Sequence, residues 1–453
     1  MTDARPSALA PEIPHGHTPG LLAAERSQAE GEFLPHVVAW NLTKRCNLRC
    51  SHCYISAGPF ETAESELTTA ECRRVIDELV AVNPSPMLIL SGGEPLVRDD
   101  LAEIASYASG CGATVVVGTN GTTLTDPRVA MLKQAGVSGV AVSVDSLDEA
   151  THDHFRGAAH ALERTKEALA RLREQRIDFV VQTTATPQNA SEIPALLDWA
   201  AAEGAVCFNL YFLVPTGRGV DLLDLAPERI ETLLAELAAA ESRYRGTMMV
   251  RAKCAPHFMR HVHHADPDSP VLSYRTRCPC GIDYCRITPD GKLTPCPYMP
   301  TEAGDLRRQS FGEIWSGSPV FAALRKRELG GRCGRCEYRM VCGGCRARAL
   351  ATTGDYLAED PGCVYEPPGD LPLVARKAMS YGSAPIAALA WSKEASERMA
   401  KIPSFVRGVV MQRVEDFARA RGLTTVTPEL LGEIRKSMPI DFSKRRPFFL
   451  KDE

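Results

Sequence analysis

Short apolar runs alternate with amphipathic segments through the first half of the chain. Between these runs, apolar residues recur every three or four positions, as in an amphipathic helix, for example over 69–82 and 161–173. Such alternation predicts a parallel sheet with crossover helices, either a barrel or an open doubly wound sheet. The runs that predict buried strands are residues 37–42, 87–90, 113–117, 140–144, 179–183 and 206–210.

The later part of the chain carries further helical periodicity. Residues 227–244 predict one more amphipathic helix. From Trp391 onward apolar residues again recur with helical period. Pro403 would divide this stretch into two helices, and Thr427-Pro428 would open a third. The pattern predicts a small helical domain in this part of the chain.

The composition is that of an ordinary globular protein. Of 453 residues, 44% are hydrophobic and 24% are charged, and the length predicts two or three domains. The net charge of −4 argues against a broad nucleic-acid surface, and no apolar run is long enough to span a membrane. The first 34 residues predict a mobile tail and lack the apolar core of a secretory signal. We therefore expect a cytoplasmic protein.

Sixteen cysteines change the picture. Without an export signal, they are more typical of metal-cluster ligands than of disulfides. Cys46, Cys50 and Cys53 have C-x3-C-x2-C spacing directly after the first apolar run. A four-iron cluster is usually held by four protein ligands, so three thiolates leave one iron free to bind a small molecule. The alternatives are a zinc knuckle or unrelated core cysteines, but no second C-x2-C pair lies nearby.

Nine more cysteines lie between Cys278 and Cys363, several of them paired as C-x2-C. Spacing alone leaves zinc and iron open for this group. Just before it, Cys254 is followed by four histidines, beginning with His257 and His261. This stretch could bind a metal or an iron porphyrin, or it could form a surface helix.

Small and polar residues stand at the carboxyl ends of three of the predicted strands. In parallel barrels the active-site residues lie at these strand ends. The segments are Ser91-Gly92-Gly93-Glu94-Pro95, Thr119-Asn120-Gly121 and Ser143-Val144-Asp145-Ser146. Such residues at successive strand ends suit a polar cofactor that lies across the mouth of a barrel.

The cysteine triad, Tyr54 and the segment Gly92-Gly93-Glu94-Pro95 resemble the radical S-adenosylmethionine (SAM) enzymes. The resemblance implies an α/β fold with a partial (β/α)6 TIM-like barrel. It also implies a [4Fe–4S] cluster on the three thiolates, which cleaves SAM reductively to a 5'-deoxyadenosyl radical. Expected cofactor-binding residues are Tyr54, Gly92, Gly93, Glu94, Asn120, Ser143 and Asp145.

The second cysteine group resembles the SPASM extension, which carries auxiliary iron–sulfur clusters in this superfamily. By this resemblance Cys280, Cys285, Cys296 and Cys345 would hold one auxiliary cluster, with Cys278 as an extra candidate. A second cluster would be held by Cys333, Cys336, Cys342 and Cys363. One or two auxiliary clusters are therefore expected.

Residues 284–298 and 342–360 look like the tetrapyrrole-modifying branch, and 391–438 are similar to a light-independent protochlorophyllide reductase subunit. These resemblances imply a tetrapyrrole substrate from which a side chain is removed or decarboxylated. They also imply a flavodoxin or ferredoxin as electron donor.

The expected units are residues 1–34 (tail), 35–250 (barrel), 251–370 (auxiliary clusters) and 385–440 (helical domain). Basic groups available for substrate carboxylates are Arg156, Arg218, Arg251, Arg346 and Arg348.

Two other functions compete with this hypothesis. A SPASM-type maturase would act on a ribosomal peptide, but such enzymes often carry an N-terminal recognition module, and only about 35 residues precede the first strand. A non-catalytic iron–sulfur carrier would need neither an open iron nor a SAM site. The sequence favours the tetrapyrrole enzyme.

Overall fold

The computed structural model describes residues 33–62, 64–222, 224–269, 271–274, 277–375, 387, 389–400, 402 and 404–437. One ten-stranded sheet dominates these residues, in the order β10-β9-β8-β1-β2-β3-β4-β5-β6-β7. Neighbouring strands are parallel from β8 through to β7, and β9 pairs in antiparallel fashion with both β8 and β10. The strands are β1 (Val37–Asn41), β2 (Met87–Ser91), β3 (Thr114–Thr119), β4 (Gly139–Ser143), β5 (Phe179–Ala185), β6 (Cys207–Phe212), β7 (Met249–Lys253), β8 (Tyr284–Ile287), β9 (Lys292–Thr294) and β10 (Gly304–Asp305).

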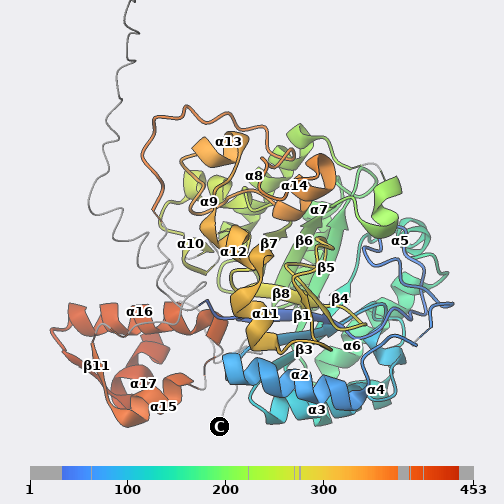
Figure 1. Cartoon of the computed structure of the whole chain (residues 1–453), viewed down its shortest axis with the longest axis horizontal. Helices are drawn as coiled ribbons and strands as arrows, with labels where there is room; N and C mark the ends of the chain where they lie inside the picture. The colour runs from blue at the N-terminus through green and yellow to red at the C-terminus, as the bar shows by residue number, and fades with distance from the viewer. Residues whose placement is uncertain are drawn as a thin grey trace, which may run out of the picture.

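Helices connect the strands and cover the outer side of the curved sheet (Figure 1). Those of the barrel are α2 (Thr69–Val82), η1 (Pro95–Val97), α3 (Leu101–Gly110), α4 (Asp126–Gln134), α5 (Glu149–Arg156), α6 (Ala161–Glu174), α7 (Ile193–Glu203), η2 (Gly217–Asp221) and α8 (Pro227–Tyr244). The cysteine-rich part adds α9 (Phe258–Ala265), α10 (Val271–Tyr274), α11 (Phe311–Gly317), α12 (Pro319–Lys326), α13 (Gly331–Arg335) and α14 (Arg346–Thr353).

The local sequence explains these elements. Helix α2 begins at a capping box in which Thr68 and Glu71 satisfy each other's backbone N–H groups. Its buried residues Cys72, Val75, Ile76 and Leu79 share one face at helical spacing. The helices predicted over 69–82 and 227–244 are confirmed by α2 and α8, and the six predicted strands correspond to β1–β6.

Alternation along the strands creates two different faces. Val38, Trp40, Leu88 and Leu90 point outward into the main core, where the helices pack. Their neighbours Val37, Ala39, Met87 and Ile89 point inward and line a cavity. The sheet is therefore a barrel wall with an apolar outer layer and an inner face that is available to ligands. In the described residues β7 and β10 are its two edges, so the barrel is partial.

The cysteine-rich part is continuous with the barrel, because β8 pairs with β1 and extends the same sheet. A second, two-stranded sheet of β11 (Ala390–Trp391) and β12 (Thr425–Val426) belongs to the C-terminal helical unit. That unit also holds α15 (Lys393–Ala400), α16 (Ser404–Ala420) and α17 (Pro428–Ser437), drawn in red in Figure 1. Pro403, the expected helix break, and residues 1–32 of the expected tail lie outside the described residues.

The helical unit contacts the amino end of the barrel. Ile402 packs against a small apolar cluster on the inner face of β2–β6, formed by Met87, Val116, Ala141, Val180 and Cys207. Arg407 donates a hydrogen bond to Ser85 Oγ just before β2. In the part of the chain that the structure describes, no helix is long and apolar enough to cross a membrane.

Candidate active site and iron–sulfur sites

The three predicted thiols lie on the loop that follows β1, and all three line the cavity inside the barrel. Each sulfur has a donor nearby: Leu48 N lies 3.4 Å from Cys46 Sγ, Ala57 N lies 3.3 Å from Cys53 Sγ, and Arg156 Nη1 lies 3.9 Å from Cys50 Sγ. Burial raises the pKa of the Cys46 thiol to about 12. A thiolate is therefore stable here only when a cation balances it, as iron would.

Two glycines, Gly92 and Gly93, allow the chain at the end of β2 to approach the cysteine loop closely. Gly93 N donates to Thr43 O at 2.7 Å, and Glu94 N donates to Arg45 O at 3.0 Å, so the segment runs alongside the start of the cysteine loop. A Cβ on Gly93 would lie 2.3 Å from Arg45 O, and one on Gly92 would lie 2.5 Å from Thr43 O. Gly92 also has a φ of +144°, which side chains disfavour. Only glycine fits this cradle, and both glycines line the cavity.

Glu94 lies behind the cavity wall, since it is fully buried and is not among the lining residues. Its carboxylate accepts from Thr119 Oγ1 at 2.9 Å, from Asn120 N at 2.9 Å and from Leu96 N at 3.1 Å. Burial raises the pKa of this carboxyl to about 6. Glu94 thus ties the end of β2 to the end of β3. Asn120 itself lines the cavity, with Nδ2 2.9 Å from Asn47 Oδ1.

Ser143 is the last residue of β4, and Asp145 lies two residues beyond it. Ser143 lines the cavity, whereas Asp145 is buried behind it and accepts from Thr184 N at 2.9 Å. The Asp145 carboxylate lies 2.5 Å from the Arg156 guanidinium, which holds the pKa of Asp145 below its usual value despite burial. Arg156 in turn reaches Cys50, so one buried cation links the end of β4 to the cysteine loop.

Tyr54 joins the barrel to the cysteine-rich part. Its hydroxyl accepts from Asn41 Nδ2 at 2.7 Å, and Asn41 Oδ1 accepts from Arg286 Nε of β8 at 2.6 Å. The Tyr54 and Tyr298 rings lie 5.1 Å apart. The aromatic face of Tyr54 is therefore fixed where the thiols and β8 meet.

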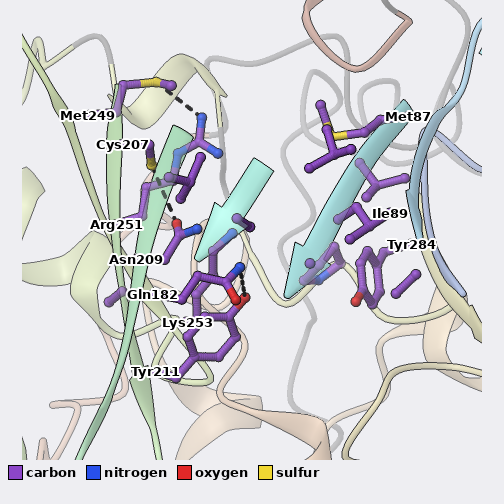
Figure 2. Close-up of a pocket in the computed structure, with 18 of the residues that line it drawn as sticks. Met87, Ile89, Gln182, Cys207, Asn209, Tyr211, Met249, Arg251, Lys253 and Tyr284 are labelled. Atoms are coloured by element: carbon purple, nitrogen blue, oxygen red, sulfur yellow. Dashed lines mark hydrogen bonds between the residues drawn. The ribbon is translucent and has the colours of Figure 1, made fainter. Parts of the chain in front are cut away.

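The cavity has a volume of about 1410 Å³, more than the roughly 300–1,000 Å³ of an ordinary small-molecule pocket. Figure 2 shows apolar Met87 and Ile89 on one wall, opposite Asn209, Arg251 and Lys253. Among the described lining residues the only carboxylate is Glu241, which is paired with Arg245 at 2.9 Å. The lining cations are Arg156, Arg218, Arg245, Arg251, Lys253, Arg277, Arg398 and Arg413. The cavity favours an anionic, largely apolar ligand.

Sequence reasoning did not predict β7, which provides Arg251 and Lys253. Its signal was the alternation in Met249-Val250-Arg251-Ala252-Lys253, which places three long side chains on one face. Of the other candidate cations, Arg218 donates through Nε to Cys50 O at 2.8 Å. Arg346 and Arg348 are buried among the later cysteines and do not line the cavity.

The four thiols expected for the second auxiliary cluster line one small cavity of about 30 Å³. Backbone N–H groups of Asp360 and Gly344 lie 3.4 Å from the sulfurs of Cys333 and Cys342, respectively. A Cβ on Gly344 would lie 2.9 Å from Cys333 Sγ. Donors to sulfur and a glycine cradle fit an iron–sulfur cluster, and the ligands would be Cys333, Cys336, Cys342 and Cys363.

Three of the four thiols expected for the first auxiliary cluster, those of Cys280, Cys296 and Cys345, pack together with Cys278 and Cys254. All five line the same large cavity as the first triad. Cys285 instead lies in the main core of the barrel. Among the described residues no three His, Cys, Asp or Glu side chains converge on a single metal ion. A four-iron cluster is larger than a single metal ion, so the thiolates that hold it lie further apart than the ligands of one ion.

The histidines after Cys254 do not converge. His257 is buried beside the second cavity, while His261 contacts Glu231 at 2.8 Å and His264 contacts Tyr338 at 2.7 Å. The stretch forms α9, whose buried side packs on α8. It supports the fold of the cysteine-rich part.

Comparison with known proteins agrees with this geometry. Residues 40–200 match the radical SAM superfamily, residues 278–337 match the SPASM iron–sulfur cluster-binding domain, and residues 391–435 match the "Proto-chlorophyllide reductase 57 kD subunit". The matches confirm the three resemblances that were expected from the motifs.

Several relatives cover most of the chain. An "AdoMet-dependent heme synthase" of Methanosarcina barkeri is 42% identical over 343 residues, 74% of this chain and 97% of the relative. A "Pre-heme d1 synthase" of Dinoroseobacter shibae is 35% identical, over 72% of this chain and 85% of the relative. More distantly, a "PqqA peptide cyclase" of Granulibacter bethesdensis is 28% identical, over 72% and 86%.

The fold is shared with Streptococcus suis SuiB bound to its precursor peptide, with a TM-score of 0.61 at 14% identity over 76% of this chain and 79% of that one. Relatives named as synthases make the chain an enzyme and remove the electron-carrier alternative. Its cofactors are [4Fe–4S] clusters and SAM. The chain belongs to the radical SAM superfamily and carries a SPASM iron–sulfur domain after its partial barrel.

Proposed function

We propose that this enzyme removes or decarboxylates a peripheral side chain of a tetrapyrrole. The observation that carries the proposal is the large cavity, which joins the three thiols on the loop after β1 to an apolar wall and an excess of cations. A tetrapyrrole is a flat apolar ring with carboxylate side chains, so it matches this lining. The relatives at 42% and 35% identity, named for heme and heme d1 synthesis, support the same substrate class.

Cys46, Cys50 and Cys53 would hold the first cluster, and the segment from Gly92 would contact SAM from the opposite side of the loop. When bound, the cluster and SAM supply one-electron chemistry that removes a hydrogen atom from an unactivated carbon. The remaining site residues have supporting roles in this proposal. Asn120, Ser143 and Tyr54 would line the SAM site, while Glu94 and Asp145 would fix the strand ends behind it.

The substrate would lie deeper, against β7. Arg251 and Lys253 project into the cavity from alternate positions of that strand, as Figure 2 shows, and would bind carboxylates of the ring. Met87, Ile89 and Met249 would contact its apolar surface and exclude water from the reacting carbon. A carboxylate held by two cations fixes which side chain faces the first cluster.

The thiols near Cys280 and Cys333 would hold the auxiliary clusters, which supply a place for the electron left by substrate oxidation. The thiols near Cys280 line the same cavity as those near Cys46, so both sets border the substrate region. A flavodoxin or ferredoxin would supply the electron that starts the reaction. In this proposal residues 35–250, 251–370 and 385–440 act as the barrel, the auxiliary-cluster unit and a helical unit.

Optical titration of the anaerobically reconstituted enzyme tests the substrate class. Iron-coproporphyrin, didecarboxysiroheme and protochlorophyllide would each be added with SAM and reductant. We expect one ring to bind with a shifted absorption band and to trigger deoxyadenosine release. If no ring binds while uncoupled SAM cleavage continues, the tetrapyrrole proposal fails and a peptide substrate becomes the better hypothesis.

A further inference from the structure

Cys254 lies directly after β7, at the point where the barrel passes into the cysteine-rich part. Its backbone has a φ of +61°, in the left-handed region that a residue with a side chain seldom adopts. Its carbonyl accepts from Arg348 Nη1 at 2.8 Å. Strained backbone of this kind persists where the surrounding structure needs the side chain in one place.

The Cys254 thiol points at the first auxiliary site. It packs against the buried cluster that contains Cys280, Cys296 and Cys345, and all four residues line the large cavity. Cys280 packs with Cys296, and its sulfur lies 3.3 Å from Cys278 Sγ. Arg348 N lies 3.4 Å from Cys345 Sγ, and the Arg348 guanidinium provides buried positive charge beside Cys254. The positive charge of Arg348 would offset the negative charge of thiolates that hold a cluster there.

Cys285 lies on the other face of its strand. Tyr284, its neighbour in β8, lines the cavity, so alternation turns Cys285 outward. There it is fully buried in the main core with Ile287 and Leu293. A shift of one residue in β8 would be needed to bring its sulfur to Cys280, and the pairing of β8 with β1 opposes that shift.

We propose that Cys254 completes the ligand set of the first auxiliary cluster with Cys280, Cys296 and Cys345, in the place that motif spacing gives to Cys285. Cys278 packs against the same cluster, with its sulfur 3.3 Å from Cys280 Sγ, and the proposal places it outside the ligand set. Each thiol loses its proton to solvent when it binds iron, and no other bond changes. The inference concerns the cluster alone and does not depend on the tetrapyrrole substrate.

The test uses the full chain with Cys46, Cys50 and Cys53 changed to Ala, so that only auxiliary clusters can form. Into this background go Cys254→Ala, Cys285→Ala and Cys278→Ala. Iron and sulfide per chain and the electron paramagnetic resonance spectrum of the reduced protein are measured after reconstitution. We expect Cys254→Ala to lose about four iron atoms per chain, or to change the spectrum, while Cys278→Ala keeps both.

Cys254→Gly separates ligation from folding, because glycine relaxes the left-handed backbone while it removes the thiol. The cluster-free chain should melt at the same or a higher temperature, and the reconstituted chain should still lack the cluster. The proposal is overturned if Cys254→Ala and Cys254→Gly keep the full iron content and an unchanged spectrum. It is equally overturned if Cys285→Ala alone loses the cluster.

Discussion

The guanidinium of Arg156 lies 2.5 Å from the carboxylate of Asp145 and also reaches the sulfur of Cys50. Both members of the ion pair are buried. The pair therefore places one fixed cation next to a thiolate that is expected to bind iron.

Changing Arg156 to Met should weaken both the fold and the cluster. An unpaired Asp145 would be left buried, which costs about 3–5 kcal/mol of unfolding free energy. Loss of the cation should also make the first cluster harder to reduce, so its midpoint potential should fall. Chemical denaturation and redox titration measure the two effects. An unchanged potential would show that the charge of Arg156 does not act on the cluster.

Replacing Gly93 with Ala should destroy the SAM site. The new Cβ would lie 2.3 Å from Arg45 O, so the cysteine loop would have to move away from the end of β2. We expect SAM affinity to fall by about two orders of magnitude or more, which corresponds to roughly 3 kcal/mol. Equilibrium binding of SAM to the reconstituted protein provides the measurement.

Gly58→Ala is the matched control for this change. Gly58 belongs to the same loop, with its carbonyl accepting from Cys46 N, but nothing lies within 4 Å of the Cβ it would gain. SAM binding should be nearly normal in this variant. Equal losses in the two variants would mean that any Cβ in the loop is harmful and that the close approach at Gly93 has no special role.

The raised pKa of Glu94, about 6 against an ordinary value of 4.5, makes stability depend on pH. Between these values the folded protein binds more protons than the unfolded chain, so stability falls as the pH rises from about 4.5 to 6. The loss is of the order of 2 kcal/mol, since each pKa unit corresponds to about 1.4 kcal/mol. It is complete about one pH unit above the folded pKa, by about pH 7.

Glu94→Gln should abolish this part of the pH dependence, because an amide does not titrate. Urea denaturation of the cluster-free protein between pH 4.5 and 7.5 gives both profiles. The difference in unfolding free energy between the original chain and the variant should change between pH 4.5 and about 7 and stay constant above that. A flat difference over the whole range would contradict the shifted pKa.

Much of the fold was predictable because the spacing of apolar residues along the sequence distinguishes strands from helices. The segments 69–82 and 227–244 have one apolar face each, and α2 and α8 have those bounds. Strand β7 was missed because polar Arg251 and Lys253 interrupt its apolar run. Their side chains face the cavity, so the interruption is itself the sign of a binding surface.

The candidate site was predictable in its residues but less so in their positions. Motif spacing brings Cys46, Cys50 and Cys53 to one loop, and all three line the cavity. Spacing cannot tell which face of a short strand a residue occupies, so the outward direction of Cys285 emerges only from the pairing of β8. The burial of Glu94 depends on Thr119, a partner 25 positions away.

Neutralising Arg251 should weaken substrate binding and leave SAM binding intact. A charged hydrogen bond to a carboxylate contributes about 1.5–3 kcal/mol, so Arg251→Gln should raise the dissociation constant of a carboxylated tetrapyrrole roughly 10- to 100-fold. Arg173→Gln, at an exposed ion pair with Glu203, is the control. Optical titration compares the two variants. An unaltered constant in Arg251→Gln would place the carboxylates elsewhere in the cavity.

Ile402 connects the C-terminal helical unit to the barrel, since it packs against the apolar cluster that includes Met87 and Val116 and also against the core of its own unit. Ile402→Asp would bury a charge in both contacts and should cost about 2–4 kcal/mol of docking free energy.

Met399 and Val410 of the same unit line the large cavity. Undocking should therefore admit water to its amino end. Hydrogen exchange at the starts of β2, β3 and β5 should accelerate, and SAM cleavage without product should increase. Leu423→Asp, at an exposed position of the same unit, should change neither. If exchange at β2 stays slow in Ile402→Asp, the helical unit does not close the barrel.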